Sequence, residues 1–433
     1  MTTTFLAAGP AAHDLRSLFW IVLVIWAAPV LAGLTRSLVP GVVLLLVGGM
    51  AIGPHGLGLA AETAGPALLA EIGLGMLFLL AGFELHVSSL TGLGGRRSLG
   101  TWFGSLLVAA GVGWLLTDSW ETAVAIGLLL TSTAVGTLLP ILKGGGHHET
   151  GVGRAVLTHG AVGELGPVVM MAVLLGTRDI GSSIAALALF VLAALMILVI
   201  PERLLQRPGL GRALVDGTTS TSQLAMRTVM LLLATMMVVA TVFELDVVLG
   251  AFAGGIILRR LVDGLGVQLR KTTDGPRRDL TEVILGQLET VGYTLFIPAF
   301  FVVSGMGISV AAVAGAPLVL VAAVASMLLI RGGGVWLGES MLRISPGLTT
   351  VRQRARVGLY AATGLPIIVA VTDVAVDNAL MDAEIASALV AAGAVTVLVF
   401  PLLAELVRAP EPLQVSQVLD QTSVSEAETE RDR

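Results

Sequence analysis

Long apolar runs follow one another along almost the whole chain, and they constrain its fold more than any other feature. A helix that crosses a membrane needs about 20 consecutive apolar residues. Clusters of glycine, proline and charge divide the chain into thirteen runs of roughly this kind: 17–38, 39–54, 64–85, 98–117, 119–142, 152–176, 180–201, 223–243, 245–260, 287–306, 311–337, 355–375 and 383–407. The sequence therefore predicts an all-α integral membrane protein with about 13 transmembrane helices.

The composition of the chain supports this class and excludes others. Apolar residues make up 55% of the chain and charged residues 13%, whereas a soluble domain carries about 25% charged residues. The chain has no cysteine, which excludes disulfides and cysteine metal sites. No nucleophile–base pair, metal-ligand cluster or basic patch for nucleic acid stands out. We expect neither an enzyme nor a cofactor, and no metal beyond a transported ion.

The positions of Lys and Arg predict the orientation in the membrane. Cytoplasmic loops carry an excess of these residues. If the N-terminus is outside, only Arg16, Arg178 and Arg331 of the 25 Lys and Arg residues fall outside the inner segments. We expect a multi-pass protein of the cell (cytoplasmic) membrane with its C-terminus inside. Residues 1–408 form the transmembrane domain, and 409–433 form an acidic tail that we expect to be disordered.

Similar segments recur seven runs apart, and they suggest an internal repeat. "GVVLLLVGGMAIGPHGLG" resembles "DVVLGAFAGGIILRR" in its paired glycines, and "LLLTSTAVGTLLPILK" resembles "GLYAATGLPIIVAVTD". Partners seven spans apart cross in opposite directions, as in the inverted repeats of secondary transporters. We therefore expect two six-helix repeats, at about 17–176 and 223–407, joined by a linking helix at about 180–201. The alternative is that glycine-rich membrane helices merely look alike.

Two of these spans carry a Thr/Gly/Pro interruption at mid-depth, "TSTAVGTLLP" and "ATGLP". Proline cannot donate to the carbonyl four residues before it, so Pro140 and Pro366 free the carbonyls of Gly136 and Ala362. Broken helices of this kind present oxygens to ions, although harmless proline kinks are also frequent. The hydroxyl candidates for a cation site are Thr131, Ser132, Thr133 and Thr363.

Glu164 is a single acid near the centre of the sixth span. An ionisable group at mid-membrane costs at least about 2.5–3.5 kcal/mol, which makes it a candidate functional residue. Pro167 leaves the carbonyl of Gly163 without its helical donor, so we expect a spare oxygen beside the carboxylate. The alternative is a protonated side chain hydrogen-bonded to another helix. We expect His159, five residues earlier, to have a packing role.

Other charged residues in the spans are assigned from their positions. Arg331 lies inside a span and does not release its proton, so we expect a counter-charge or structural role. Glu71 is either interfacial or an accessory acid in a cavity. Glu84 lies at the inner end of its span, where we expect a solvated charge.

The chain resembles the monovalent cation:proton antiporter superfamily, in the branch with bacterial Na+/H+ and K+/H+ exchangers. The resemblance rests on the order and spacing of these segments: "GPHGLGLA", "EIGLGMLFLLAGFEL", "LLLTSTAVGTLLPIL", "GAVGELGPVV", "LLGAFAGGIIL", "FFVVSGMGIS" and "IRGGG". It implies a homodimeric antiporter in which two crossed, broken helices meet an acidic helix and a mobile core moves like an elevator. It further implies that Glu164 binds cation and proton alternately, and that Arg331 occupies the place of the family's Lys or Arg.

The chain departs from the family pattern at Gly163–Glu164, where relatives commonly have Asp-Asp, Asn-Asp or Gln-Asp. Because the first polar position is missing, we expect electroneutral exchange of one proton for one Na+ or K+. Two other functions remain open from the residues alone. One is an organic-anion transporter with Arg331 as the counter-charge, and the other is a membrane sensor that does not transport.

Overall fold

The computed structural model describes residues 10–34, 39–85, 92–117, 119–144, 146–174, 180–205, 224–272 and 280–407, and the statements below concern this part of the chain. The predicted tail at 409–433 lies outside it. The described residues form α-helices and two π-helical segments, η1 and η2. The elements are α1 (Pro10–Leu34), α2 (Gly41–Ile52), α3 (Ala64–Glu84), α5 (Leu93–Leu116), α6 (Trp120–Thr131), α7 (Val135–Gly144), α8 (Gly151–Leu174), α9 (Ile180–Leu205), α11 (Leu224–Val242), α12 (Val247–Thr272), α13 (Leu280–Val291), η1 (Gly292–Phe296), α14 (Ile297–Gly307), α15 (Val310–Gly315), α16 (Pro317–Ser326), η2 (Met327–Gly332), α17 (Gly333–Leu342), α18 (Val351–Ala361), α19 (Leu365–Asp377) and α20 (Ala383–Leu406).

The predicted fold class is confirmed, because the described residues build an all-helical membrane-type protein. Eleven helical stretches in the described residues are long and apolar enough to cross a membrane, and α2 is a shorter apolar helix. Each of the thirteen predicted ranges corresponds to a helix or to consecutive helical segments. The exact number of crossings stays a prediction, since α2 has only 12 residues.

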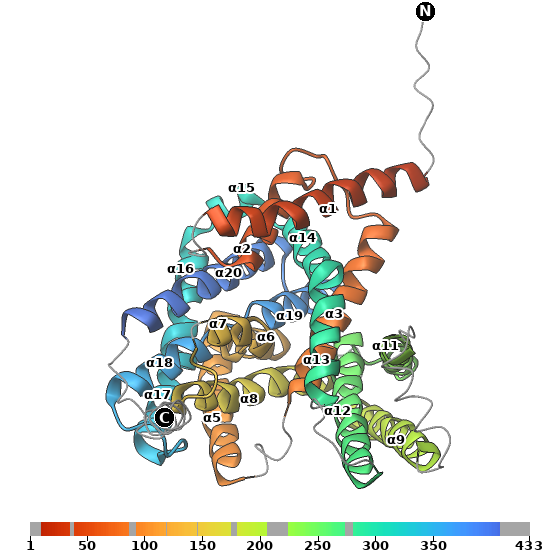
Figure 1. The fold of residues 1–433 in the computed structure, drawn as a ribbon. Helices are drawn as coiled ribbons and strands as arrows, with labels where there is room; N and C mark the ends of the chain where they lie inside the picture. The colour runs from red at the N-terminus through yellow and green to blue at the C-terminus, as the bar shows by residue number, and fades with distance from the viewer. Residues whose placement is uncertain are drawn as a thin grey trace, which may run out of the picture.

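The helices gather into two groups, with α6, α7 and α19 lying between the outer elements (Figure 1). The scaffold bundle consists of α1–α3 and α11–α14, in which α3 packs on α12 and α2 on α14. The crossing bundle consists of α5–α8 and α16–α20, in which α8 packs on α5 and α18. Helix α9 contacts both groups through α8 and α12. The two groups meet where α7 contacts α3, α8 contacts α12 and α20 contacts α2.

Glycines allow the closest helix contacts of the scaffold bundle. A Cβ on Gly82 of α3 would lie 2.1 Å from a carbonyl oxygen of α12, and one on Gly255 of α12 would lie 2.1 Å from a carbonyl of α3. Gly49 of α2 and Gly305 of α14 approach each other's helices in the same way, at 2.0 and 2.3 Å. Small residues commonly bring membrane helices this close. The predicted inverted repeat would match α2 with α12 and α3 with α14, and it stays a prediction.

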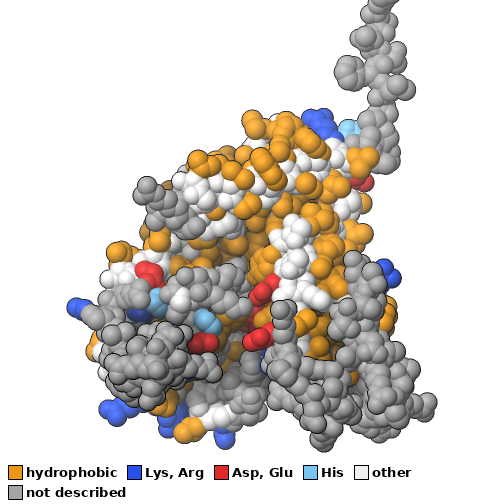
Figure 2. Space-filling view, viewed as in Figure 1, with side chains coloured by type: hydrophobic (Ala, Val, Ile, Leu, Met, Phe, Trp, Pro, Cys, Tyr) orange, Lys and Arg blue, Asp and Glu red, His pale blue; other side chains and the backbone are white. Residues whose placement is uncertain are grey.

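Apolar side chains also cover much of the outer surface, as expected where lipid replaces water. Leu115 of α5 is 84% exposed and Leu318 of α16 is 80% exposed. Figure 2 shows hydrophobic side chains over α1 and the elements beside it. Because the surface is apolar, charged residues buried inside either bundle need an explanation of their own.

Candidate functional site

Two broken helices meet at the centre of the crossing bundle. Helix α6 ends at Thr131 and α7 begins at Val135, while α18 ends at Ala361 and α19 begins at Leu365. The backbone N–H of Ala134 in the first break donates to the Thr363 carbonyl in the second, at 2.8 Å. The three residues of each break are therefore held by tertiary contacts, as non-helical backbone at membrane depth requires.

The prolines do not free oxygens in the way expected from the sequence. Pro366 lies in the first turn of α19, where a missing N–H removes no helical bond. The Gly136 carbonyl, four residues before Pro140, accepts a hydrogen bond from the Tyr293 hydroxyl at 2.9 Å. The Gly163 carbonyl accepts one from the Thr133 N–H, also at 2.9 Å. The expectation of a spare oxygen beside Glu164 is wrong, because the adjacent break supplies a donor.

The predicted hydroxyl ligands are all buried in or beside the breaks. Thr131 donates to the Gly127 carbonyl at 2.7 Å, and Ser132 donates to that of Leu129 at 2.9 Å. Thr363 donates to the Tyr360 carbonyl at 2.8 Å. A hydroxyl that donates its proton still has lone pairs, so these oxygens remain able to coordinate a cation.

Glu164 is only 4% exposed on α8. The backbone N–H of Val135, the first residue of α7, faces its carboxylate. The amino end of a helix carries a partial positive charge that stabilises an anion. The break thus points a helix N-terminus at the acid, which can hold a negative charge, a proton or a cation there.

Arg331 is fully buried in η2 and holds the other side of the break. Its Nε donates to the Thr133 hydroxyl at 3.1 Å, and Nη2 donates to the His159 carbonyl at 2.8 Å. A Cβ on Gly163 would lie 2.4 Å from that Nη2. The guanidinium therefore occupies the space that a side chain at position 163 would need. Because Thr133 binds Arg331, its hydroxyl is the least suited of the four candidates to bind a cation.

This arrangement agrees with the comparison with protein families. A sequence model of the family described as "Sodium/hydrogen exchanger, transmembrane" matches residues 19–405. The chain belongs to the sodium/hydrogen exchanger family. The predicted superfamily is thereby confirmed, and it is a family of transporters.

Two curated relatives carry different names. The chain is 22% identical over 316 residues to "Putative Na(+)/H(+) antiporter YjbQ" of Bacillus subtilis, covering 69% of this chain and 48% of that protein. It is 28% identical over 247 residues to "Iron transporter MagA" of Paramagnetospirillum magneticum, covering 53% of this chain and 54% of that protein. The chain thus spans about half the length of the curated relatives it matches.

Solved structures show the same fold. The sodium proton antiporter MjNhaP1 from Methanocaldococcus jannaschii aligns with a TM-score of 0.62 at 15% identity, covering 91% of this chain and 96% of that one. A second structure of that antiporter gives a TM-score of 0.61 at 16% identity. At this identity the likeness establishes the fold alone.

The sequence does not reveal a buried histidine–carboxylate pair beside Arg331. His159 Nε2 lies 2.8 Å from Glu339 Oε1, and both side chains are buried. The other ring nitrogen of His159, Nδ1, lies 2.9 Å from the Ser98 hydroxyl. The expected packing role of His159 was therefore incomplete, since its side chain joins α8 to α17 and α5. An acid two residues beyond the predicted span 311–337, and eight after Arg331, was the available signal.

The structure also changes the expectation for Glu84. One of its carboxylate oxygens is buried, and its charge acts on both Glu164 and Tyr293. The expectation of a solvated end charge is met only in part, because Glu84 is half-buried and α3 also contacts α7 of the crossing bundle. A second carboxylate thus lies near Glu164, and it comes from the scaffold bundle and not from position 163.

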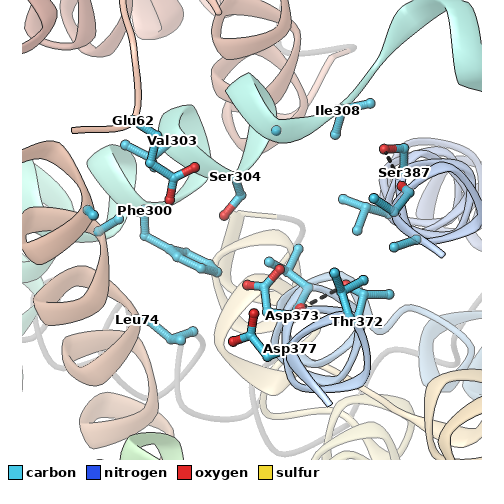
Figure 3. A pocket seen from close by; sticks show the side chains of 18 of the residues that line it. Glu62, Leu74, Phe300, Val303, Ser304, Ile308, Thr372, Asp373, Asp377 and Ser387 are labelled. Carbon is cyan, nitrogen blue, oxygen red and sulfur yellow. Dashed lines mark hydrogen bonds between the residues drawn. The ribbon is translucent and has the colours of Figure 1, made fainter. Parts of the chain in front are cut away.

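Glu71 lies in a different place from Glu164. It lines a cavity of about 440 Å³ between α3, α14, α19 and α20, together with Glu62, Asp373 and Asp377. Figure 3 shows Asp373 and Asp377 on one wall of this cavity and Glu62 on the other. Glu164 is not among the lining residues. The cavity therefore ends short of the carboxylate in this conformation.

Proposed function

We propose that this chain is a secondary antiporter that exchanges Na+ or K+ for H+ across the cell membrane. Family membership supports cation:proton exchange. The observation that carries the site is the buried Glu164 carboxylate opposite the α7 N-terminus, beside two broken helices. Cation and proton would occupy this carboxylate in turn, and the oxygens of Thr131, Ser132 and Thr363 would complete a hard oxygen shell. We expect a homodimer with its N-terminus outside.

Arg331 would act as a fixed charge and not as a proton carrier. It stays protonated in proteins, and its hydrogen bonds to Thr133 and the His159 carbonyl tie it to the break and to α8. The guanidinium would then keep its place through the transport cycle while Glu164 exchanges its ligand.

The stoichiometry follows from the number of acids that exchange protons. If Glu164 alone does so, one monovalent cation leaves for each proton that enters, and no charge moves. Glu84 is the residue that would change this count, since its charge acts on Glu164. A current that reverses with the ion gradients in reconstituted membranes would contradict one-to-one exchange. Its disappearance in Glu84→Gln would identify the second acid.

The deciding experiment is proton flux in proteoliposomes after addition of Na+, K+ or Li+. Flux with one or more of these ions, above that of protein-free liposomes, is the expected result. The absence of flux with all three would reject the proposal. It would favour an organic-anion transporter or a membrane sensor.

The transport step would be an elevator-like movement of the crossing bundle against the scaffold bundle. A Cβ on Gly136 of α7 would lie 3.4 Å from Cδ1 of Leu77 in α3, so the two positions face each other across the boundary between the bundles. The natural chain has no cysteine, and Leu77→Cys combined with Gly136→Cys would introduce only this pair. We expect crosslinking, by oxidation or by a short cleavable bis-thiol reagent, to reduce exchange about tenfold or more and reduction to restore it, because the crosslink fixes one conformation. Each single variant controls for oxidation, and undiminished exchange with complete crosslinking would contradict the movement.

A further inference from the structure

Tyr293 joins the scaffold bundle to the broken helix beside Glu164. It lies in η1, which contacts α3, α13 and α14. Its hydroxyl donates to the Gly136 carbonyl in the first turn of α7, at 2.9 Å. The bond connects positions 157 residues apart in the sequence. It therefore links two parts of the protein that the proposed movement separates.

The acceptor of this bond, the Gly136 carbonyl, has no helical donor of its own. Proline at position 140 removes the N–H that would satisfy the Gly136 carbonyl inside a helix. Leaving a buried carbonyl without a hydrogen-bond donor costs about 1–3 kcal/mol of stability. The Tyr293 hydroxyl meets this need in the conformation seen here. The proposed movement between the bundles would separate the carbonyl from this donor.

The donor is placed by an irregular helix. Of the described residues, two segments are π-helical, and each contributes one side chain to the α6–α7 break region. Arg331 in η2 binds Thr133, and Tyr293 in η1 binds Gly136. The π-helical turns often occur at functional sites. The break is thus held from the crossing bundle by Arg331 and from the scaffold bundle by Tyr293.

We propose that Tyr293 is a positioning residue that latches the scaffold bundle to the α7 N-terminus in this conformation and must release it during each transport cycle. This inference rests on the proposed antiport and on movement between the bundles. The latch holds the turn whose first N–H faces Glu164. Removing it lowers the population of this conformation relative to the one that opens to the opposite side.

The test compares Tyr293→Phe with the wild type in inside-out and right-side-out vesicles. The half-saturating concentration of the cation that the wild type transports is measured at each face. A lost neutral hydrogen bond changes an equilibrium about threefold to tenfold. We expect the ratio of the two half-saturating concentrations to shift by about that factor, because a population shift weakens binding at one face and strengthens it at the other.

The chain offers a matched control in its other tyrosine. The Tyr360 hydroxyl donates to Glu405 at 2.7 Å and joins α18 to α20 within the crossing bundle. Tyr360→Phe loses a stronger hydroxyl bond, since its acceptor is a carboxylate, and should still leave the ratio unchanged. Pro140→Ala provides a second route, because the new N–H competes for the Gly136 carbonyl. It should shift the ratio in the same direction as Tyr293→Phe.

The possible outcomes separate this inference from the function on which it rests. Absence of flux in the wild type would reject the antiport itself. Normal wild-type flux with an unchanged ratio in Tyr293→Phe would reject the latch alone, as would equal changes at both faces. If Tyr293→Phe does not fold, an unchanged ratio in Pro140→Ala would reject it.

Discussion

Replacing Glu164 with Gln is expected to reduce cation-dependent proton flux about a hundredfold or more. Glutamine keeps the size of the side chain and can still accept from the Val135 N–H, but it neither carries charge nor exchanges a proton. Breaking a buried charge interaction costs about 3–5 kcal/mol, which corresponds to this loss of binding. The measurement is flux in proteoliposomes with the cation that the wild type transports.

Two controls sharpen this prediction. Glu164→Asp keeps a carboxylate on a shorter side chain, and we expect it to retain flux with a higher half-saturating cation concentration. Glu84→Gln removes the neighbouring acid and should leave one-for-one exchange in place. Equal thermal stability of the three variants would show that the differences arise at the site. Wild-type flux in Glu164→Gln would refute the assignment of Glu164 as the exchanging acid.

Replacing Gly163 with Asn is expected to destabilise the protein severely. A Cβ there would lie 2.4 Å from Arg331 Nη2 and 2.6 Å from the Thr133 hydroxyl. Overpacking costs about 1–3 kcal/mol, and each lost hydrogen bond of the guanidinium about 1.5–3 kcal/mol more. We expect a lower melting temperature in detergent and loss of flux.

The second-site change Arg331→Ala should recover part of the melting temperature of Gly163→Asn, because it empties the contested space, but it should not recover flux. Gly264→Asn is the matched control. A Cβ at position 264 meets nothing within 4 Å. The free energy of unfolding of this variant should therefore lie within about 1 kcal/mol of the wild-type value. If Gly163→Asn were as stable as the wild type, the claim that Arg331 occupies this space would be wrong.

The helical ranges and the buried acid could be read from the sequence because each depends on local chemistry. A run of about 20 apolar residues must be helical in lipid whatever surrounds it, and a charge in such a run is costly in any fold. The positions of both breaks also followed from local Thr/Gly/Pro patterns. The structure places the breaks at Ser132–Ala134 and Ala362–Gly364, inside the predicted segments and ahead of each proline.

The partners of these groups could not be read from the sequence, because they come from distant segments. The donor that satisfies the Gly163 carbonyl is the Thr133 N–H, and the donor for Gly136 is Tyr293. Glu84 was assigned to solvent because its position at a helix end says nothing about the bundle packed against it. Pairing of His159 with Glu339 likewise joins residues 180 positions apart.

The sequence by itself determined that this chain is a helical membrane protein with two broken helices and one central acid, since apolar run length, proline and buried charge act locally. Only the tertiary structure decided what lies beside that acid. It brings the α7 N-terminus to the Glu164 carboxylate, fills the space above Gly163 with Arg331, and sets Glu84 and Tyr293 across the boundary between the bundles. Distances between side chains of different helices depend on packing, which no local pattern encodes.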